Sequence, residues 1–264
     1  MKVISKIGIM QGRLTNYSID KLSIYPKAPS VEIEIAKKHK LSHIEFLSEE
    51  YFNKNNLIWS DKKIEIITQK LKTNKIKKIS FIDNYSVKNS IVKNNSTYYK
   101  KLINQVKKLR VKNFIIPLLG SSKINNQNYF KFIEPLNQIS NYCSLKKINF
   151  LVETDIDYKL YKKIKKKIKN NLGIVFDTGN NSHVNSDYIN QIKLFKNHIQ
   201  HVHLKDKNKK DKNVMFGAGI VDFKSIFSTL KSINYKGYYT LESTRGDNAQ
   251  KTLISNLKYI KKCL

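Results

Sequence analysis

The chain has 264 residues, 40% of them hydrophobic and 11% aromatic, which is enough to bury one large core in a single domain covering 1–264. Its formal net charge of +30 raises the possibility of a nucleic-acid partner, but of its 50 basic residues only three are arginines (Arg13, Arg110 and Arg245), which leaves 47 lysines. Arginine is the basic residue best suited to hydrogen-bond bases and to bind phosphate through two parallel hydrogen bonds. The composition therefore argues against a nucleic-acid partner and favours solvated, lysine-rich helix faces.

Cysteine usage and hydropathy predict the compartment. Cys143 and Cys263 are too few for a disulfide framework, and no CxxC motif suggests a zinc finger. The first residues contain no apolar segment of the length of a signal peptide, and nowhere do about 18 consecutive apolar residues occur. We expect a cytoplasmic protein without a membrane span.

Strand-like apolar runs alternate with amphipathic helical stretches eight times along the chain. The strands are predicted at 4–9, 43–47, 78–82, 113–118, 148–152, 173–176, 199–204 and 238–241, and the helices near 30–40, 61–73, 97–110, 129–146, 157–169, 186–197, 223–233 and 248–262. Such alternation requires parallel strands joined by right-handed crossovers. Eight repeats predict an α/β fold, the (β/α)8 TIM barrel. A doubly wound open sheet is the alternative, disfavoured because no GxGxxG follows the first strand.

Four metal-capable side chains close successive predicted strands in the second half of the chain. They are Glu153, Asp177, His203 and Glu242. A lone acid at a strand end is more often a helix cap or a loop residue. Four such residues at the ends of successive strands indicate a shared site instead, because parallel barrel strands end at one rim, where the four side chains could converge. Three carboxylates and one imidazole suit one divalent ion, most often Mn²⁺, Mg²⁺ or Co²⁺, with Zn²⁺ also compatible.

The segments around these residues resemble the xylose-isomerase-like superfamily of TIM barrels, which includes the tagatose 3-epimerase and hydroxypyruvate isomerase groups of sugar and sugar phosphate isomerases. The matching segments are Leu-Val-Glu-Thr at 151–154, Phe-Asp-Thr-Gly-Asn at 176–180, His-Val-His-Leu-Lys-Asp at 201–206, Leu-Glu-Ser at 241–243 and the loop at 216–223. The resemblance implies that Glu153, Asp177, His203 and Glu242 hold the metal. It also implies that Glu153 and Glu242 transfer a proton through a metal-stabilised enediolate, as catalytic residues of an isomerase or epimerase.

The same resemblance suggests which residues contact the substrate, a small sugar, sugar phosphate or sugar derivative. The residues expected to bind it are Glu45, which is predicted to end its strand, Asn180 and Lys205. Asn180 stands where many epimerases of this superfamily have histidine, and an amide cannot carry a proton. Arg13 and Arg245 follow the first and eighth strands, which are neighbours in a closed barrel, so they form either an anion clamp or a pair of surface arginines.

Two further residues are expected to support the site from behind. His201 lies two positions before His203 and should face the same side of its strand, filling the barrel interior. Asp206 should orient His203 or the neighbouring loop, although it could simply be a turn residue.

Other functions share parts of this pattern. A sugar dehydratase or lyase of the same superfamily would use the same ligands and the same proton abstraction. An endonuclease IV-like DNA-repair enzyme would need further metal ligands after the third and fourth strands, where this chain has Asp83 and the apolar 116–118. A non-catalytic sugar-binding barrel is a third alternative, and a homodimer is compatible with the fold.

Overall fold

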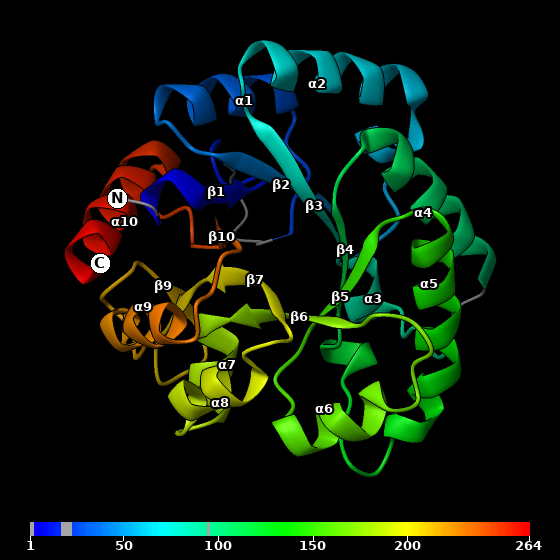
Figure 1. The fold of residues 1–264 in the computed structure, drawn as a ribbon. Coiled ribbons are helices and arrows are strands. Elements are labelled where there is room, and N and C mark those ends of the chain that lie inside the picture. Colours follow the sequence, from blue (N-terminus) through cyan, green and yellow to red (C-terminus); the bar gives the residue numbers. More distant parts are fainter. Residues whose placement is uncertain (1–2, 17–22, 94–95) are drawn as a thin grey trace.

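Eight parallel strands close into a barrel in the computed structural model, which describes residues 3–16, 23–93 and 96–264 (Figure 1). The strands are β1 (Ile7–Met10), β2 (His43–Ser48), β3 (Lys77–Asp83), β4 (Asn113–Pro117), β5 (Asn149–Glu153), β6 (Gly173–Asp177), β7 (Ile199–Leu204) and β10 (Tyr238–Leu241). Each pairs with the strand before and after it, and β10 pairs with β1 to complete the circle. The predicted (β/α)8 barrel is confirmed.

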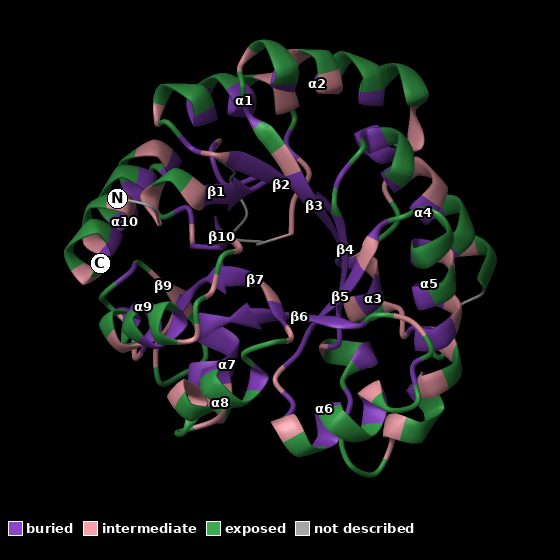
Figure 2. Ribbon diagram, in the orientation of Figure 1, coloured by how far each residue is buried: buried purple, intermediate pink, exposed green. Residues whose placement is uncertain are grey.

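Helices surround the barrel and follow the strands in turn, as Figure 1 shows. The principal ones are α1 (Pro29–Lys38), α2 (Asp61–Thr73), α4 (Ser96–Leu109), α5 (Ile133–Leu145), α6 (Tyr158–Lys165), α8 (Tyr188–Phe195), α9 (Phe223–Ser232) and α10 (Ala249–Cys263). In α4 the buried residues Tyr99, Leu102, Ile103, Val106 and Leu109 recur at the three- and four-residue spacing of one helix face. Figure 2 shows the same division, with exposed residues along the outer surfaces of the helices.

Several short elements were not predicted. The strand expected to begin at residue 4 starts instead with the 3₁₀ turn η1 (Ile4–Lys6). The helices α3 (Tyr85–Lys88) and α7 (Thr178–Val184) begin within two residues of the ends of β3 and β6. The remaining unpredicted elements are η2 (Leu57–Trp59), η3 (Gly120–Ser122) and the hairpin β8 (Asp206–Lys207) and β9 (Asn213–Val214), whereas η4 (Tyr129–Phe132) forms the start of the helix predicted near 129–146. Such elements are too short to show a periodic pattern.

The apolar residues form two separate cores. The larger lies between the strands and the helices and includes the buried rings of Phe46, Phe81, Phe114 and Phe176. The smaller takes one residue from each of β1 to β6: Met10, Leu47, Ile82, Ile115, Leu151 and Val175. Because side chains alternate along a strand, Leu151 faces the same side as Glu153, so this cluster fills the barrel interior beneath the site.

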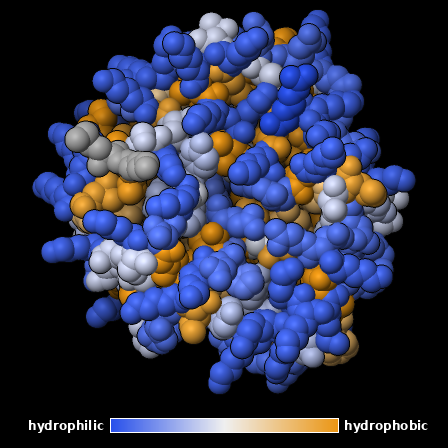
Figure 3. All heavy atoms as spheres, viewed as in Figure 1, coloured by the Kyte–Doolittle hydropathy of each residue, from blue (hydrophilic) through white to orange (hydrophobic). Residues whose placement is uncertain are grey.

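Polar side chains are spread over the surface. In the space-filling view of Figure 3, hydrophilic residues cover most of the visible face and apolar atoms show between them. Within the described residues, no helix has the length and apolar character needed to cross a bilayer.

Candidate metal centre and active site

The four predicted ligands converge at the carboxyl ends of adjacent strands. Glu153 ends β5, Asp177 ends β6, His203 lies near the end of β7, and Glu242 follows β10. Each offers one ligand atom, and these four atoms lie within 4.8 Å of one another. Asp177 and His203 are direct neighbours in the register of β6 and β7. All four side chains are buried, so the closed barrel holds three carboxylates and an imidazole in one small volume.

His203 presents its two ring nitrogens to different carboxylates. Nδ1 lies 3.3 Å from Glu153 Oε2 and 3.1 Å from Glu242 Oε2, whereas Nε2 lies 2.8 Å from Glu45 Oε1. Burial alone would lower the pKa of His203, but the charge of Glu45 and the contacts with Glu153 and Glu242 raise it well above its usual value. Neither His203 Nδ1 nor Glu242 Oε2 makes a hydrogen bond of ordinary geometry within the described residues. These buried atoms and the oxygen-rich donor set fit a divalent cation.

Glu45 lies in the middle of β2, deeper in the barrel than the ligands, so the prediction that it ends a strand was wrong. Its side chain is completely buried, with His201 Nε2 at 3.0 Å and the Ser80 hydroxyl donating to it. Burial would raise the pKa of Glu45, but the imidazoles of His203 and His201 hold it well below its ordinary range. The carboxylate is therefore ionised and faces His203 from the side opposite the other ligands.

A polar chain continues from Glu45 toward the amino ends of the strands. His201 Nε2 also lies 2.8 Å from Thr240 Oγ1, and His43 Nε2 lies 2.9 Å from the same hydroxyl. Burial lowers the pKa of both histidines, that of His43 to about 3, so His43 is neutral. Gly8 leaves room for it, because a Cβ at residue 8 would lie 2.3 Å from the His43 ring. His201 thus occupies the barrel interior, as its position two residues before His203 indicates.

Lys205 and Asn180 contact the ligands themselves. The Lys205 Nζ lies 3.0 Å from Asp177 Oδ2 and 2.8 Å from Glu242 Oε1. Although burial opposes it, the two carboxylates raise the pKa of Lys205, so the ammonium group stays charged. The Asn180 amide donates to Glu153 Oε1 at 2.8 Å, and its backbone N–H donates to Asp177 Oδ1 at 2.6 Å, which caps α7.

The two arginines that follow β1 and β10 belong to neighbouring loops, as the barrel closure predicts, and Arg245 contacts the residue before Arg13. Arg13 Nη2 is 3.9 Å from Glu242 Oε1, and Arg245 Nε donates to the carbonyl of Gly12 at 2.5 Å. Both side chains are buried, so neither is a free surface residue. Arg13 and Lys205 therefore place two positive charges beside Glu242, while Arg245 also holds the loop after β1.

Asp206 organises the loop after β7 and does not contact His203. Its Oδ2 accepts hydrogen bonds from the backbone of Gly217 at 2.9 Å and Gly219 at 3.1 Å, and its Oδ1 from Val221 at 3.2 Å. Glycine is needed at both positions: residue 217 has φ +87°, and a Cβ at residue 219 would lie 2.1 Å from Asp206 Oδ1. The carboxylate thus takes the role of a cap for three backbone donors.

The pKa values of the two glutamates are shifted in opposite directions. Burial raises the pKa of Glu153, and the negative charge of Glu242 raises it further. Burial would also raise the pKa of Glu242, but Lys205 and His203 lower it well below its ordinary range. Two glutamates whose pKa values are shifted in opposite directions in one site are suited to give and to accept a proton.

Comparison with known proteins extends this description. The sequence profile of the family described as the xylose isomerase-like TIM barrel matches residues 33–263. The chain belongs to this family. The L-ribulose-5-phosphate 3-epimerase UlaE of Escherichia coli is 33% identical over 126 residues, which cover 45% of this chain and 44% of that protein, less than half of its length. Over this segment, the chain is similar to a sugar phosphate epimerase.

Solved structures share the fold at low sequence identity. D-psicose 3-epimerase with D-tagatose from Clostridium cellulolyticum H10 has a TM-score of 0.72 at 14% identity, covering 97% of this chain and 99% of that one. The IOLI protein with a bound zinc atom has a TM-score of 0.72 at 16% identity, covering 98% and 99%. These similarities show that the whole barrel, rather than one segment, follows the family architecture.

Sequence reasoning missed the interior residues His43, Ser80 and Thr240. A signal was present, because His43 and Glu45 on one strand and His201 and His203 on another follow the two-residue period of a single strand face. Polar residues with that period in a run otherwise apolar indicate a polar barrel interior.

Proposed function

We propose that the protein is a divalent-metal-dependent sugar isomerase or epimerase. The observation that carries the proposal is the convergence of Glu153, Asp177, His203 and Glu242 within 4.8 Å at one barrel rim. The similarity to UlaE and the shared fold of a D-psicose 3-epimerase support a sugar or sugar phosphate as the substrate class. The donor set favours Mn²⁺, Mg²⁺ or Co²⁺, and the zinc in the related IOLI structure keeps Zn²⁺ among the candidates.

Four residues would hold the metal: the three carboxylates and His203 through Nδ1, the nitrogen that faces Glu153 and Glu242. Once bound, the ion would polarise a substrate carbonyl and stabilise the negative charge that develops on its oxygen. His203 Nε2 would donate to Glu45, an arrangement that fixes the tautomer and the ring orientation. Complete burial favours this orienting role for Glu45 over the substrate contact expected from the sequence.

Glu242 and Glu153 are the proposed proton carriers. Glu242 is ionised beside Lys205 and can accept a proton from the carbon next to the carbonyl. Glu153 has a raised pKa and can supply a proton to the neighbouring carbon or to the opposite face. Asn180 holds Glu153 by its amide, so its role is to set the direction of the carboxyl group.

Lys205 and Arg13 form the cationic side of the site. Their head groups lie 2.8 Å and 3.9 Å from the same oxygen of Glu242. Substrate oxygens close to Glu242 would therefore meet two positive charges, and we assign both residues to substrate binding. Arg245, which binds the Gly12 carbonyl, is assigned to positioning the loop that carries Arg13.

A dehydratase or lyase would use the same proton abstraction and is the second candidate. The DNA-repair alternative finds less support. Within the described residues, the other metal-capable group is Glu45, His201 and His203 inside the barrel, and Asp83, the last residue of β3, belongs to neither group. A multi-metal cluster at the rim has no ligands from β3 or β4.

The test compares metal content and proton exchange in the wild-type protein and in Glu153→Gln/Glu242→Gln. Elemental analysis of chelator-free protein should give one tightly bound divalent ion in the wild type and much less in the variant. The wild type should also incorporate solvent deuterium next to the carbonyl of a ketose or ketose phosphate. Absence of metal at every supplied concentration would refute the metal site. Metal binding without deuterium incorporation into any of the ketoses and ketose phosphates tested would refute the isomerase activity.

A further inference from the structure

The loop after β1 is closed around a buried carboxylate from the first turn of α1. Glu32 is 1% exposed, and its carboxylate accepts hydrogen bonds from the backbone N–H groups of Gly12 at 2.8 Å and Leu14 at 3.1 Å. The Thr15 hydroxyl donates to the same carboxylate at 3.2 Å. A buried acid that belongs to neither metal-capable group of the described residues therefore organises the first loop of the barrel.

Arg13 lies between the two backbone groups that Glu32 binds. The N–H of Gly12 donates to Glu32 Oε2 and that of Leu14 to Oε1, so one carboxylate holds the peptide groups on both sides of Arg13. The Leu14 side chain is also buried in the larger core. With its backbone fixed on both sides, the direction of the Arg13 side chain is fixed as well, and its Nη2 lies 3.9 Å from Glu242 Oε1.

Gly12 is fixed from two further directions. Its carbonyl accepts from Arg245 Nε at 2.5 Å. Its φ is +81°, and a Cβ at this position would collide with the carbonyl of Ile24, so glycine is required. Burial raises the pKa of Glu32, whereas the two backbone hydrogen bonds and the charge of Arg245 lower it. The acid and Arg245 therefore lie within electrostatic reach of each other, on either side of the loop.

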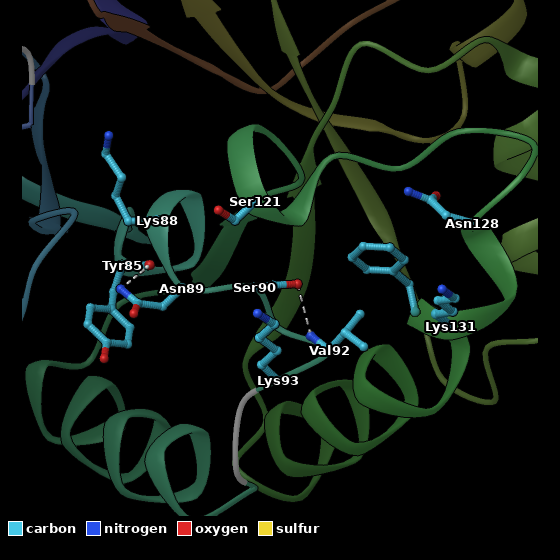
Figure 4. A pocket seen from close by; sticks show the side chains of 10 residues that line it. Tyr85, Lys88, Asn89, Ser90, Val92, Lys93, Ser121, Asn128 and Lys131 are labelled. Atoms are coloured by element: carbon cyan, nitrogen blue, oxygen red, sulfur yellow. Dashed lines mark hydrogen bonds between the residues drawn. The ribbon is translucent and has the colours of Figure 1, made fainter.

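The loops after β3 and β4 hold their cations differently. They border a surface depression lined by the exposed residues Lys88, Lys93 and Lys131, which Figure 4 shows at separate places around it. Lys88 Nζ lies 3.9 Å from Glu50 Oε2, and both side chains are largely exposed. Exposed pairs of this kind fix the position of a side chain weakly. The loop after β1 instead places its cation through buried hydrogen bonds, as a precise site requires.

We propose that Glu32 is the positioning residue of Arg13, holding its guanidinium group beside Glu242, where it contacts a substrate oxygen. The contact with substrate rests on the proposed function, whereas the placement of Arg13 by Glu32 does not. Glutamine cannot replace the acid, because the two N–H groups bind different oxygens and the amide has only one. Glu32→Gln should therefore release one of the two peptide groups beside Arg13 at almost unchanged side-chain volume.

The first measurement is the rate at which phenylglyoxal modifies Arg13, followed by mass spectrometry, which needs neither metal nor substrate. Arg13 is 2% exposed, so modification should be slow in the wild type. It should be about tenfold faster or more in Glu32→Gln. Glu34→Gln neutralises an exposed acid on the same helix, and Asp206→Asn weakens the loop after β7. Both controls should leave the rate at Arg13 unchanged, which separates local release from loss of charge and from lower global stability.

The second measurement is kcat/KM for the ketose or ketose phosphate that exchanges deuterium best. Glu32→Gln should lower kcat/KM about tenfold or more, mainly through KM, and should add little to the effect of Arg13→Met. A modification rate at Arg13 equal to that of the wild type would overturn the proposal whether or not the protein is active. Effects of the two substitutions that multiply would also overturn it, because Glu32 would then act through another residue. Wild-type protein that exchanges no ketose would refute the proposed function alone, since the modification rates still decide what holds Arg13.

Discussion

Substitution of Glu45 by glutamine tests whether the barrel interior supports the proposed metal site. The change keeps the side-chain volume but removes the charge that faces His203 Nε2 at 2.8 Å and His201 Nε2 at 3.0 Å. Loss of the carboxylate behind a histidine ligand typically reduces metal affinity about 10- to 100-fold. Glu45 is completely buried, so water cannot replace it, and we expect the upper part of this range, roughly 2 to 2.7 kcal/mol of binding free energy.

The assay is competition for Mn²⁺ or Zn²⁺ between a fluorescent chelator and metal-stripped protein. The matched control is Asp83→Asn, which also neutralises a buried, hydrogen-bonded carboxylate but touches none of the ligands. Glu45→Gln should bind the ion more weakly, and Asp83→Asn should bind it as the wild type does. Equal affinity in all three proteins would show that Glu45 does not orient His203.

The remaining predictions concern stability and geometry. Asp206→Asn should lower the free energy of unfolding, measured in urea, by about 1.5 to 3 kcal/mol, because a charged acceptor of backbone N–H groups is lost. The loop should then be cleaved faster by a protease, and a rate of cleavage within 206–222 equal to that of the wild type would contradict the role of Asp206. Gly179→Ala should cost about 1 to 3 kcal/mol and reduce activity, because its Cβ would lie 2.9 Å from Lys205 Cγ; an unaltered melting temperature would refute the close contact. Burial raises the pKa of Asp83 to about 6, above its unfolded value of 3.8, so its contribution to stability is full below the unfolded pKa and is lost as pH rises to about 6. The stability of Asp83→Asn relative to wild type should therefore increase by about 2 to 3 kcal/mol from pH 4 to pH 8, and parallel pH profiles would exclude the shift.

The barrel and its four proposed ligands could be predicted because both depend on local pattern. Each ligand closes an apolar run, and parallel strands bring such positions to one rim whatever the loops between them do. The same reasoning placed Arg13 beside Arg245, since it needed only the closure of the first and last strands.

The partners inside the barrel could not be predicted in the same way. Whether Glu45 meets a substrate or His203 depends on how far β2 extends past it and on the stagger of the strands, which alternation alone does not reveal. The position of α7 was missed for a related reason: its seven residues begin at Thr178, directly after Asp177, so the helix cap and a proposed metal ligand are the same side chain.

The supports of the site are divided unequally between the two halves of the chain. All four proposed ligands come from β5, β6, β7 and the end of β10, whereas Glu45 comes from β2, on the other half of the closed ring. A fragment containing only the second half would carry all four proposed ligands but would lack the Glu45 carboxylate that faces His203 Nε2. The contact between Glu45 and His203 thus joins the two halves of the barrel at the site. A chimera that takes its first half from a relative would keep this contact only if that half supplied an acid at the position of Glu45.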